Sequence, residues 1–377
     1  MHKMNSAIVI GSGILGSSTA YHLAKQGVQV TIVDREEEGQ ATKAAAGIIC
    51  PWYAQRRNKA WYSLADQGAV YYRKLIDDLS TEGENVTGYK QVGMLGIHTD
   101  EEKLIRAKDR VLKRREDTPE IGDVELLSKE ETIKKFPLLN DEYRSLYISG
   151  GARVNGYELN KALLNVAQKF GAKIITGDAS LIYKNNKVSG VTVNGEEVLA
   201  DKTIACTGAW MNELLQPLGI NFNAHPQKAQ IIHLNVPNSY TDDWPVIMPP
   251  NNQYILPNDN SKIIIGATHE KNAGFDRRLT AGGIHEVLTK AIDVAPALAD
   301  ATFSHVNVGF RPFTPDSIPV IGKLDGIEQF ILATGLGASG LTTGPFVGKQ
   351  LSLLALNESL SINLDLYQPN QAIKNNN

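Results

Sequence analysis

The stretch of sequence that most constrains the fold lies near the N-terminus, over residues 7–35. Residues 7–10 form a short apolar run rich in β-branched side chains, so we expect a buried parallel strand. A GxGxxG pattern follows, then a helical pattern over 14–25, then a second apolar run over 28–33 that ends in Asp34. This strand–turn–helix–strand order makes the glycine pattern a specific sign of dinucleotide binding rather than of a turn that merely packs.

Each glycine of the pattern has its own steric reason. Gly11 would permit the tight turn, Gly13 would let the backbone approach a pyrophosphate, and Gly16 would let the helix pack close to the strand. The helix start at Ile14 and Leu15 would offer N–H groups and the positive end of the helix dipole to the phosphates. The pattern therefore predicts where a pyrophosphate would bind.

Asp34 stands where an acidic side chain can accept hydrogen bonds from a ribose diol. A 2′-phosphate would be repelled at this position, which argues against NADP. Arg35 comes next, and residues 41–47 are mostly small. Small side chains leave space for a flat or extended molecule against the backbone, although a tightly packed helix start would explain them as well. We favour contact with a cofactor.

Composition excludes several classes of protein. The 377 residues are comfortable for two domains, and a net charge of −3 gives no electrostatic case for nucleic acid or an acidic membrane. No stretch approaches the roughly 20 apolar residues of a membrane span, and no signal pattern precedes residue 7. The two cysteines, Cys50 and Cys206, fit a reducing cytoplasm, and no metal-ligand spacing is present. We expect a cytoplasmic protein without a metal, and homo-oligomerisation stays open.

In the rest of the chain, segments whose apolar residues recur at helical spacing alternate with segments whose apolar residues recur at strand spacing. A capping box at Ser128 and Glu131 predicts a short helix, and Asn185-Asn186 and Asn194-Gly195 predict hairpin turns. Residues 369–377 resemble a frayed tail. Helices are expected over 61–79, 101–116, 157–170 and 280–291, and strands over 88–98, 173–175, 202–206, 229–236, 253–256, 262–268 and 303–312.

A second glycine-rich passage lies near the C-terminus. An apolar, strand-like run over 330–333 is followed by four glycines within 335–344 and by helix to about Leu356. Because the first passage can already hold a pyrophosphate, the second must hold something else, unless it is only a flexible loop. A flavin ring fits, because N–H groups at a helix start could stabilise negative charge on its reduced pyrimidine end. An NAD-binding domain would not need this passage.

Together these passages resemble the D-amino-acid oxidase family of FAD-dependent oxidoreductases, which includes glycine oxidase, D-amino acid dehydrogenase and sarcosine oxidase. The resemblance covers nearly the whole chain. Its marks are both glycine-rich passages, Asp34, and the segments 41–48, 207–210 and 309–316. It implies an α/β fold with a Rossmann-type FAD-binding domain over 1–87, 146–220 and 315–368, a mixed-sheet α+β substrate domain over 88–145 and 221–314, and a tail over 369–377.

The resemblance also implies the residues that contact FAD. A flavin-linking cysteine of related sarcosine oxidases corresponds to Gly309 here, so we expect non-covalent FAD. The expected contacts are Gly11, Gly13, Ile14, Leu15, Gly16, Asp34, Arg35, Ala41, Thr42, Ala46, Gly47, Ile48, Ser180, Gly208, Leu336, Gly337, Ala338, Ser339, Gly340, Leu341 and Thr342.

The implied reaction is oxidation of the Cα–N bond of a small amino acid, with hydride passing from Cα to the flavin and the imine then hydrolysing. Arg311 can grip a carboxylate bidentately, and its partner would be either the substrate or a structural acid. Tyr254 matches the family's active-site tyrosine but could be a core tyrosine, and His269 ends a strand that faces the flavin in relatives but could be structural. Ala338 replaces an arginine of glycine oxidase-like sequences, which predicts a more open or less cationic pocket.

Several functions stay open at this point. A D-amino acid, glycine or an N-methyl amino acid could be the substrate, and oxygen or a membrane carrier could accept the electrons. An NAD-dependent dehydrogenase with incidental C-terminal glycines, or a flavin-binding module without turnover, would fit fewer of the motifs.

Overall fold

A six-stranded, mostly parallel sheet contains the strand before the first glycine-rich turn and the strand after the helix that follows this turn. The computed structural model describes residues 4–56 and 58–374. All neighbouring strands of this sheet are parallel except the edge strand β19, which is antiparallel to β20. In spatial order the strands are β19 (Val320–Lys323), β20 (Phe330–Thr334), β13 (Lys202–Ala205), β1 (Ser6–Ile10), β2 (Gln29–Asp34) and β9 (Lys173–Thr176).

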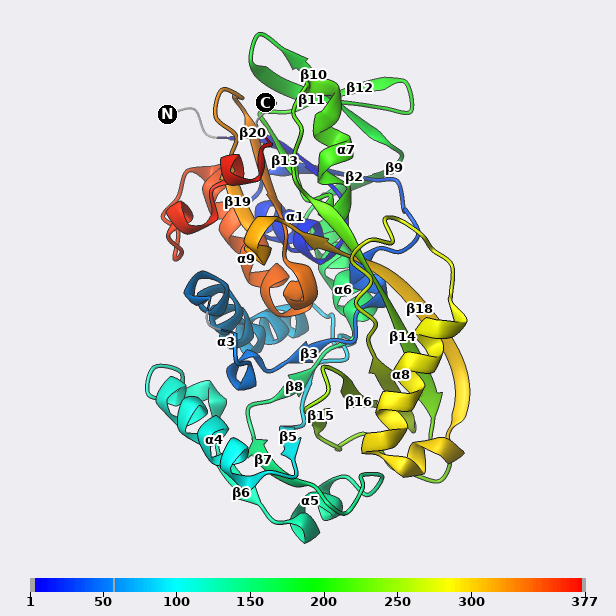
Figure 1. The fold of residues 1–377 in the computed structure, drawn as a ribbon. Helices are drawn as coiled ribbons and strands as arrows, with labels where there is room; N and C mark the ends of the chain where they lie inside the picture. The colour runs from blue at the N-terminus through cyan, green and yellow to red at the C-terminus, as the bar shows by residue number, and fades with distance from the viewer. Residues whose placement is uncertain (1–3, 57, 375–377) are drawn as a thin grey trace.

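Helix packing brings the two glycine-rich passages together. The predicted helix α1 (Ile14–Lys25) is confirmed, and it packs against α9 (Gly340–Leu356) and α6 (Gly156–Lys169), while α3 (Lys59–Thr81) packs against α9 (Figure 1). A Cβ at Gly348 would lie 2.6 Å from the Cβ of Ser18, so only glycine allows this approach of α9 to α1. The helix starts of α1 and α9 therefore lie close to one another although they are far apart in sequence.

An eight-stranded, mostly antiparallel sheet forms the other half of the molecule, in the lower part of Figure 1. α8 (Ala281–Val294) packs against two of its strands and shares a buried apolar cluster with it. In spatial order the strands are β18 (Thr302–Phe313), β14 (His225–Asn235), β17 (Lys262–Gly266), β16 (Tyr254–Asn258), β15 (Val246–Met248), β5 (Met94–His98), β7 (Arg144–Ile148) and β6 (Val124–Leu127).

Shorter elements complete the fold. The predicted hairpin turns and the capping box of α5 are confirmed. All four turn residues, Asn185, Asn186, Asn194 and Gly195, have positive φ. The elements are the three-stranded sheet of β10 (Ala179–Lys184), β11 (Lys187–Val193) and β12 (Glu196–Leu199), the sheet of β3 (Ile48–Ile49), β8 (Ala152–Arg153) and β4 (Lys90–Gln91), and the helices α2 (Ala41–Ala44), α4 (Glu101–Arg115), α5 (Lys129–Lys135) and α7 (Met211–Leu215).

The expected frayed tail is wrong for residues 369–374. Ala372 is 1% exposed and packs in the apolar cluster that contains Phe222 and Phe330. Its carbonyl accepts a hydrogen bond from the N–H of Asn223 at 2.6 Å. A buried alanine in a polar sequence gives no local signal of packing, which is why composition misses this contact. Residues 375–377 lie outside the described residues.

The two sheets draw on different parts of the chain. The predicted domain boundary between residues 145 and 146 falls inside β7, which pairs only within the eight-stranded sheet. The division into two domains itself stays a prediction. None of the helices in the described ranges has the length and apolar character needed to cross a bilayer.

Candidate active site

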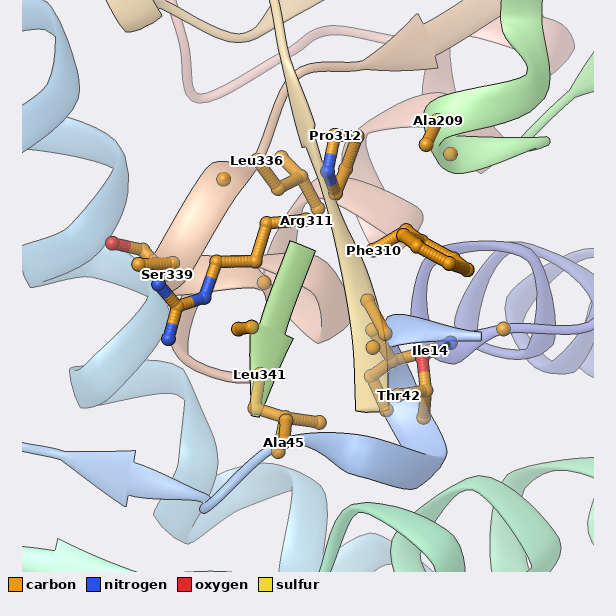
Figure 2. Close-up of a pocket in the computed structure, with 18 of the residues that line it drawn as sticks. Ile14, Thr42, Ala45, Ala209, Phe310, Arg311, Pro312, Leu336, Ser339 and Leu341 are labelled. Atoms are coloured by element: carbon orange, nitrogen blue, oxygen red, sulfur yellow. Dashed lines mark hydrogen bonds between the residues drawn. The ribbon is translucent and has the colours of Figure 1, made fainter. Parts of the chain in front are cut away.

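A large cavity is lined by residues of both sheets (Figure 2). Its volume is about 1330 Å³, which exceeds the roughly 300–1,000 Å³ typical of a pocket for one small ligand. The turn after β1, the end of β2, the segment before α9 and the strands β14, β16 and β18 all contribute to its wall. The cavity therefore has room for an extended cofactor together with a small substrate.

The residues predicted to contact a cofactor gather around this cavity, with one exception. Gly16 does not line it. Whether the others touch the cofactor stays a prediction. The lining members are Gly11, Gly13, Ile14, Leu15, Asp34, Arg35, Ala41, Thr42, Ala46, Gly47, Ile48, Ser180, Gly208, Leu336, Gly337, Ala338, Ser339, Gly340, Leu341 and Thr342.

The first glycine-rich turn leaves a cradle where a pyrophosphate fits. Gly11 has φ +96°, and a Cβ there would lie 2.5 Å from the carbonyl oxygen of Cys206. A Cβ at Gly16 would lie 1.8 Å from the carbonyl oxygen of Gly11, so Gly16 serves close packing behind the cavity wall. The N–H of Ile14 donates to Thr42 Oγ1 at 2.9 Å, so the threonine hydroxyl satisfies one of the donors at the helix start.

Asp34 is almost fully engaged by protein donors. Its Oδ2 accepts from the N–H and the hydroxyl of Ser12, at 2.5 and 2.8 Å. Its Oδ1 accepts from the N–H of Glu36 at 2.6 Å and from Gln40 Nε2 at 2.9 Å. Because each oxygen already accepts two hydrogen bonds, a ribose diol here would have to share them with the Ser12 hydroxyl and the Gln40 amide, the two donors whose side chains can turn away.

Arg35 is balanced by acids and is not a free cation. Its guanidinium lies 2.7 Å from Glu213, 3.2 Å from Asp178 and 3.0 Å from Glu37. The hydrogen bond to Glu213 raises the pKa of Arg35, so it stays charged. This end of the cavity is consequently acidic overall, and Arg35 adds no net positive charge to it.

Arg311 lies on β18 and extends into the cavity (Figure 2). Its Nη1 donates to His269 Nδ1 at 3.0 Å and lies 3.4 Å from Gln227 Oε1. Within residues 4–56 and 58–374, no carboxylate oxygen lies within 4.0 Å of its guanidinium. Burial lowers the pKa of Arg311, which reflects the cost of a charge without an anionic partner. The structural acid that was the alternative partner is therefore not found in the described part of the chain.

Tyr254 and His269 also line the cavity. Burial raises the pKa of the Tyr254 phenol to about 12, so its hydroxyl is protonated and can donate a hydrogen bond. Burial, and then the nearby Arg311, lower the pKa of His269, so its imidazole is neutral near pH 7 and can accept the hydrogen bond from Arg311. The three predicted side chains Arg311, Tyr254 and His269 thus all line the same cavity.

Sequence analysis missed two polar contacts of the site. Gln227 stands opposite Arg311 in the β14–β18 register and is 6% exposed. Trp61 Nε1 donates to Ser339 Oγ at 3.0 Å, which links the start of α3 to the segment before α9. A polar side chain in an apolar strand is a signal for Gln227, but only the register of strands far apart in sequence places it beside the guanidinium.

The position that corresponds to the flavin-linking cysteine of related sarcosine oxidases, Gly309, has no room for a side chain. A Cβ at Gly309 would lie 2.6 Å from the Cβ of Ala44, so no side chain fits there without movement of α2. Cys50 and Cys206 line the cavity, and burial raises the pKa of each thiol to about 12. Both thiols are protonated near neutral pH and are therefore poor nucleophiles.

Two glycine-rich helix starts that face one cavity, with an unpaired guanidinium on its wall, are the features that a flavin-dependent oxidoreductase needs in order to hold FAD beside an anionic substrate. Comparison with protein families agrees. Residues 6–354 match the family described as FAD dependent oxidoreductase (DAO), and the chain belongs to this family. FAD is accordingly its cofactor, and the cradle, the cavity volume and the small residues of α2 fit that molecule.

Individual relatives cover nearly the whole chain. The uncharacterized oxidoreductase YurR of Bacillus subtilis (strain 168) is 54% identical over 98% of this chain and 100% of that protein. The crystal structure of iminodiacetate oxidase from Chelativorans sp. BNC1 superposes with a TM-score of 0.94 at 41% identity, covering 96% of this chain and 98% of that one. Glycine oxidase from Bacillus cereus ATCC 14579 gives a TM-score of 0.84 at 25% identity, covering 97% and 98%.

Proposed function

We propose that this protein oxidises the Cα–N bond of a small amino acid, such as glycine, an N-substituted glycine or a D-amino acid, to an imine that then hydrolyses. The observation that carries the proposal is Arg311: its guanidinium lines the cavity shared by both glycine-rich passages and has no carboxylate partner among the described residues. A buried cation without an anion is costly, and the carboxylate of an amino acid is the anion that this reaction would bring.

Orientation of the substrate is the main task of the protein in such a reaction. Arg311 binds the carboxylate through its planar fork, and the protonated hydroxyl of Tyr254 donates to the same carboxylate. His269 and Gln227 contact Arg311 Nη1 and hold the guanidinium in place, so they act as positioning residues. With one end of the substrate fixed in this way, Cα and the amine are held at a constant place in the cavity.

The residues that would hold FAD are the helix start of α1 for the pyrophosphate, Asp34 for the ribose, and the segment before α9 for the flavin end. FAD, when bound, would supply the acceptor for the hydride that leaves Cα when the Cα–N single bond becomes the C=N bond of the imine. Non-covalent binding is supported by the closed space at Gly309.

The names of two relatives support the substrate class. Iminodiacetate and glycine both carry an amine nitrogen one carbon away from a carboxylate. This is the arrangement that Arg311 and Tyr254 would orient. A small amino acid with a primary or secondary amine is therefore the substrate class that we propose.

Anaerobic flavin bleaching tests the proposal. The purified protein is mixed with glycine, N-methyl amino acids, iminodiacetate, D-amino acids and L-amino acids, and the absorbance of the oxidised flavin near 450 nm is followed. We expect at least one amine with an adjacent carboxylate to bleach the flavin, while the matching amine without a carboxylate does not. Bleaching by none of them would overturn the proposal. Release of peroxide in air, against turnover only with a dye, then distinguishes oxygen from another electron acceptor.

A further inference from the structure

Charged side chains divide the cavity into two chemically different ends. The acids among its described lining residues are Asp34, Glu37, Asp178 and Glu213. Three of them pair with Arg35, and Asp34 is its neighbour in sequence, so all four belong to the ribose end. The remaining lining residues that are basic or can become so are His98, Lys103, His269, Lys271 and Arg311. Apart from the ribose end, the lining thus includes the cations Lys103, Lys271 and Arg311 and no acid among the described residues. We call the part that contains Arg311 the substrate end.

Strand register places Lys271 and Arg311 on opposite sides of Gln227, in line across three neighbouring segments of chain. Gln227 pairs with Arg311 between β14 and β18. On the other side of β14, Lys228 and Glu270 exchange two backbone hydrogen bonds at 3.2 and 3.0 Å, which puts Lys271 opposite Gln227. Neighbouring strands lie roughly 4.8 Å apart, so the backbones of Arg311 and Lys271 are about 10 Å apart. Both side chains line the cavity and can converge on one small molecule.

The acid next to Lys271 in sequence does not neutralise it. The Glu270 carboxylate accepts hydrogen bonds from Gln230 Nε2 and Thr268 Oγ1, both at 2.8 Å, and lies 3.5 Å from the buried Lys228 ammonium. Lys271 itself has no carboxylate within 4.0 Å among the described residues. Its ammonium is therefore a free cation at the substrate end.

We propose that Lys271 binds a second carboxylate and that the substrate is a dicarboxylic amino acid. This inference rests on the proposed function, because Arg311 must hold the carboxylate beside the carbon that is oxidised. Lys271 then holds the other carboxylate, which the substrate carries either on its nitrogen substituent or on its side chain. Ala338 lines the same cavity and adds little bulk, which leaves space for the larger molecule.

Paired substrates that differ by one carboxylate test the inference. Iminodiacetate is compared with N-methylglycine, and D-aspartate with D-alanine, in the wild type and in Lys271→Met. We expect the ratio of kcat/KM, dicarboxylate over monocarboxylate, to fall at least tenfold in the variant for one of the pairs, mainly through KM. The first pair responds if the second carboxylate is on the nitrogen substituent, and the second pair if it is on the side chain. Lys271→Arg should restore most of the ratio.

Lys262→Met is the matched control, because Lys262 is exposed at the start of β17, the strand that precedes Lys271 in sequence, and also has no ion-pair partner among the described residues. It should keep the wild-type ratio. In the wild type, added KCl should lower kcat/KM more for the favoured dicarboxylate than for its monocarboxylate counterpart. Ratios unchanged within twofold for both pairs in Lys271→Met, with the flavin still bleached, would overturn this inference alone. Absence of bleaching in the wild type by these four amines and by every other amine of the panel named under the proposed function would overturn the proposed function with it.

Discussion

At the scale of single residues, the side chains that contact the Arg311 guanidinium are neutral. A carboxylate beside it would have paired with the charge and closed the site, whereas an imidazole nitrogen and an amide oxygen hold the guanidinium without cancelling it. The neutral state of His269 is part of this arrangement, because a protonated ring could not accept the hydrogen bond from Arg311. The site is thus arranged to receive an anion.

Replacement of Arg311 by alanine should weaken catalysis strongly while leaving the fold intact. Loss of a bidentate, charge-assisted contact is expected to cost about 2–4 kcal/mol of transition-state binding, which is roughly 30- to 900-fold in kcat/KM. Anaerobic flavin reduction measured by stopped flow gives this number. Arg106→Ala is the control, since Arg106 is an exposed arginine on α4 that pairs with Glu102, and it should leave the rate unchanged. An Arg311→Ala rate within twofold of the wild type would exclude this role.

At the element scale, the contact between α1 and α9 decides whether one cofactor can touch both glycine-rich passages. Glycines on α9 permit it: a Cβ at Gly344 would lie 2.8 Å from Ile14 Cγ2, and one at Gly348 would lie 2.9 Å from the carbonyl oxygen of Leu15. The hydroxyl of Ser18 donates to the carbonyl oxygen of Pro345 at 2.7 Å and ties the two helices together.

Gly348→Ala should separate these helices and weaken FAD binding. Overpacking of this kind typically costs about 1–3 kcal/mol of unfolding free energy. Gly282→Ala is the matched control: this glycine also lies in a helix, but nothing lies within 4 Å of its added Cβ. The control should be as stable as the wild type or up to about 1 kcal/mol more stable, because alanine favours helix. Thermal unfolding and FAD titration measure both effects, and equal behaviour of the two variants would contradict the role of this contact.

His22 connects α1 to α3 and makes this part of the fold sensitive to acid. Burial lowers its pKa to about 3, and it is hydrogen-bonded to the Tyr71 hydroxyl at 2.9 Å. The unfolded chain binds a proton near pH 6.5 that the folded protein does not bind until about pH 3, so stability should be lost as the pH falls through this window. The slope is at most about 1.4 kcal/mol per pH unit for one proton.

Denaturant unfolding from pH 7 to pH 4 measures this slope. His22→Gln should flatten it relative to the wild type, whereas replacement of the exposed His285 on α8 should not. A slope in His22→Gln as steep as in the wild type would show that other groups cause the acid sensitivity.

Local patterns predict elements well and their long-range pairing poorly. The helix over 14–25 matches α1 at both ends, because the glycine turn and Gly27 mark its limits. Exposure of single apolar residues is harder to predict: Ile105 on α4 is 43% exposed, because the buried stripe of Leu104, Ala107 and Val111 follows the i, i+3, i+7 spacing and leaves position 105 outside it. Phe170 is 37% exposed, since it is the C-cap residue of α6 and lies beyond the last buried turn of the helix.

On the scale of the whole molecule, the cavity lies where residues of the six-stranded sheet and residues of the eight-stranded sheet both contribute to its lining. The segment after β17 reinforces this: Phe275 stacks on Trp210 with ring centroids 5.0 Å apart, and Arg277 pairs with Glu38 at 2.7 Å. Arg311 and Tyr254 could be selected from sequence by the motifs around them. The position of Gln227 and Lys271 beside Arg311 could not, because it depends on the β18–β14 register and on a bridge between residues 228 and 270.

FAD should leave the protein when the fold is destroyed. Space is closed at Gly309, and both cysteine thiols near the cavity are protonated, so no covalent link is expected. Precipitation with trichloroacetic acid should therefore leave all flavin absorbance in the supernatant. Yellow colour that stays with the washed pellet would contradict non-covalent binding.

One spatial relation is central to the proposed function: FAD lies between the helix starts of α1 and α9, and the carboxylate of the substrate lies on Arg311. A crystal structure of the FAD complex with N-acetylglycine, a carboxylate that does not react, measures it directly. We predict the flavin in the cavity between those helix starts and the ligand carboxylate within hydrogen-bond distance of Arg311 and Tyr254. A ligand carboxylate bound elsewhere, or Arg311 paired with an acid of the protein, would contradict the account.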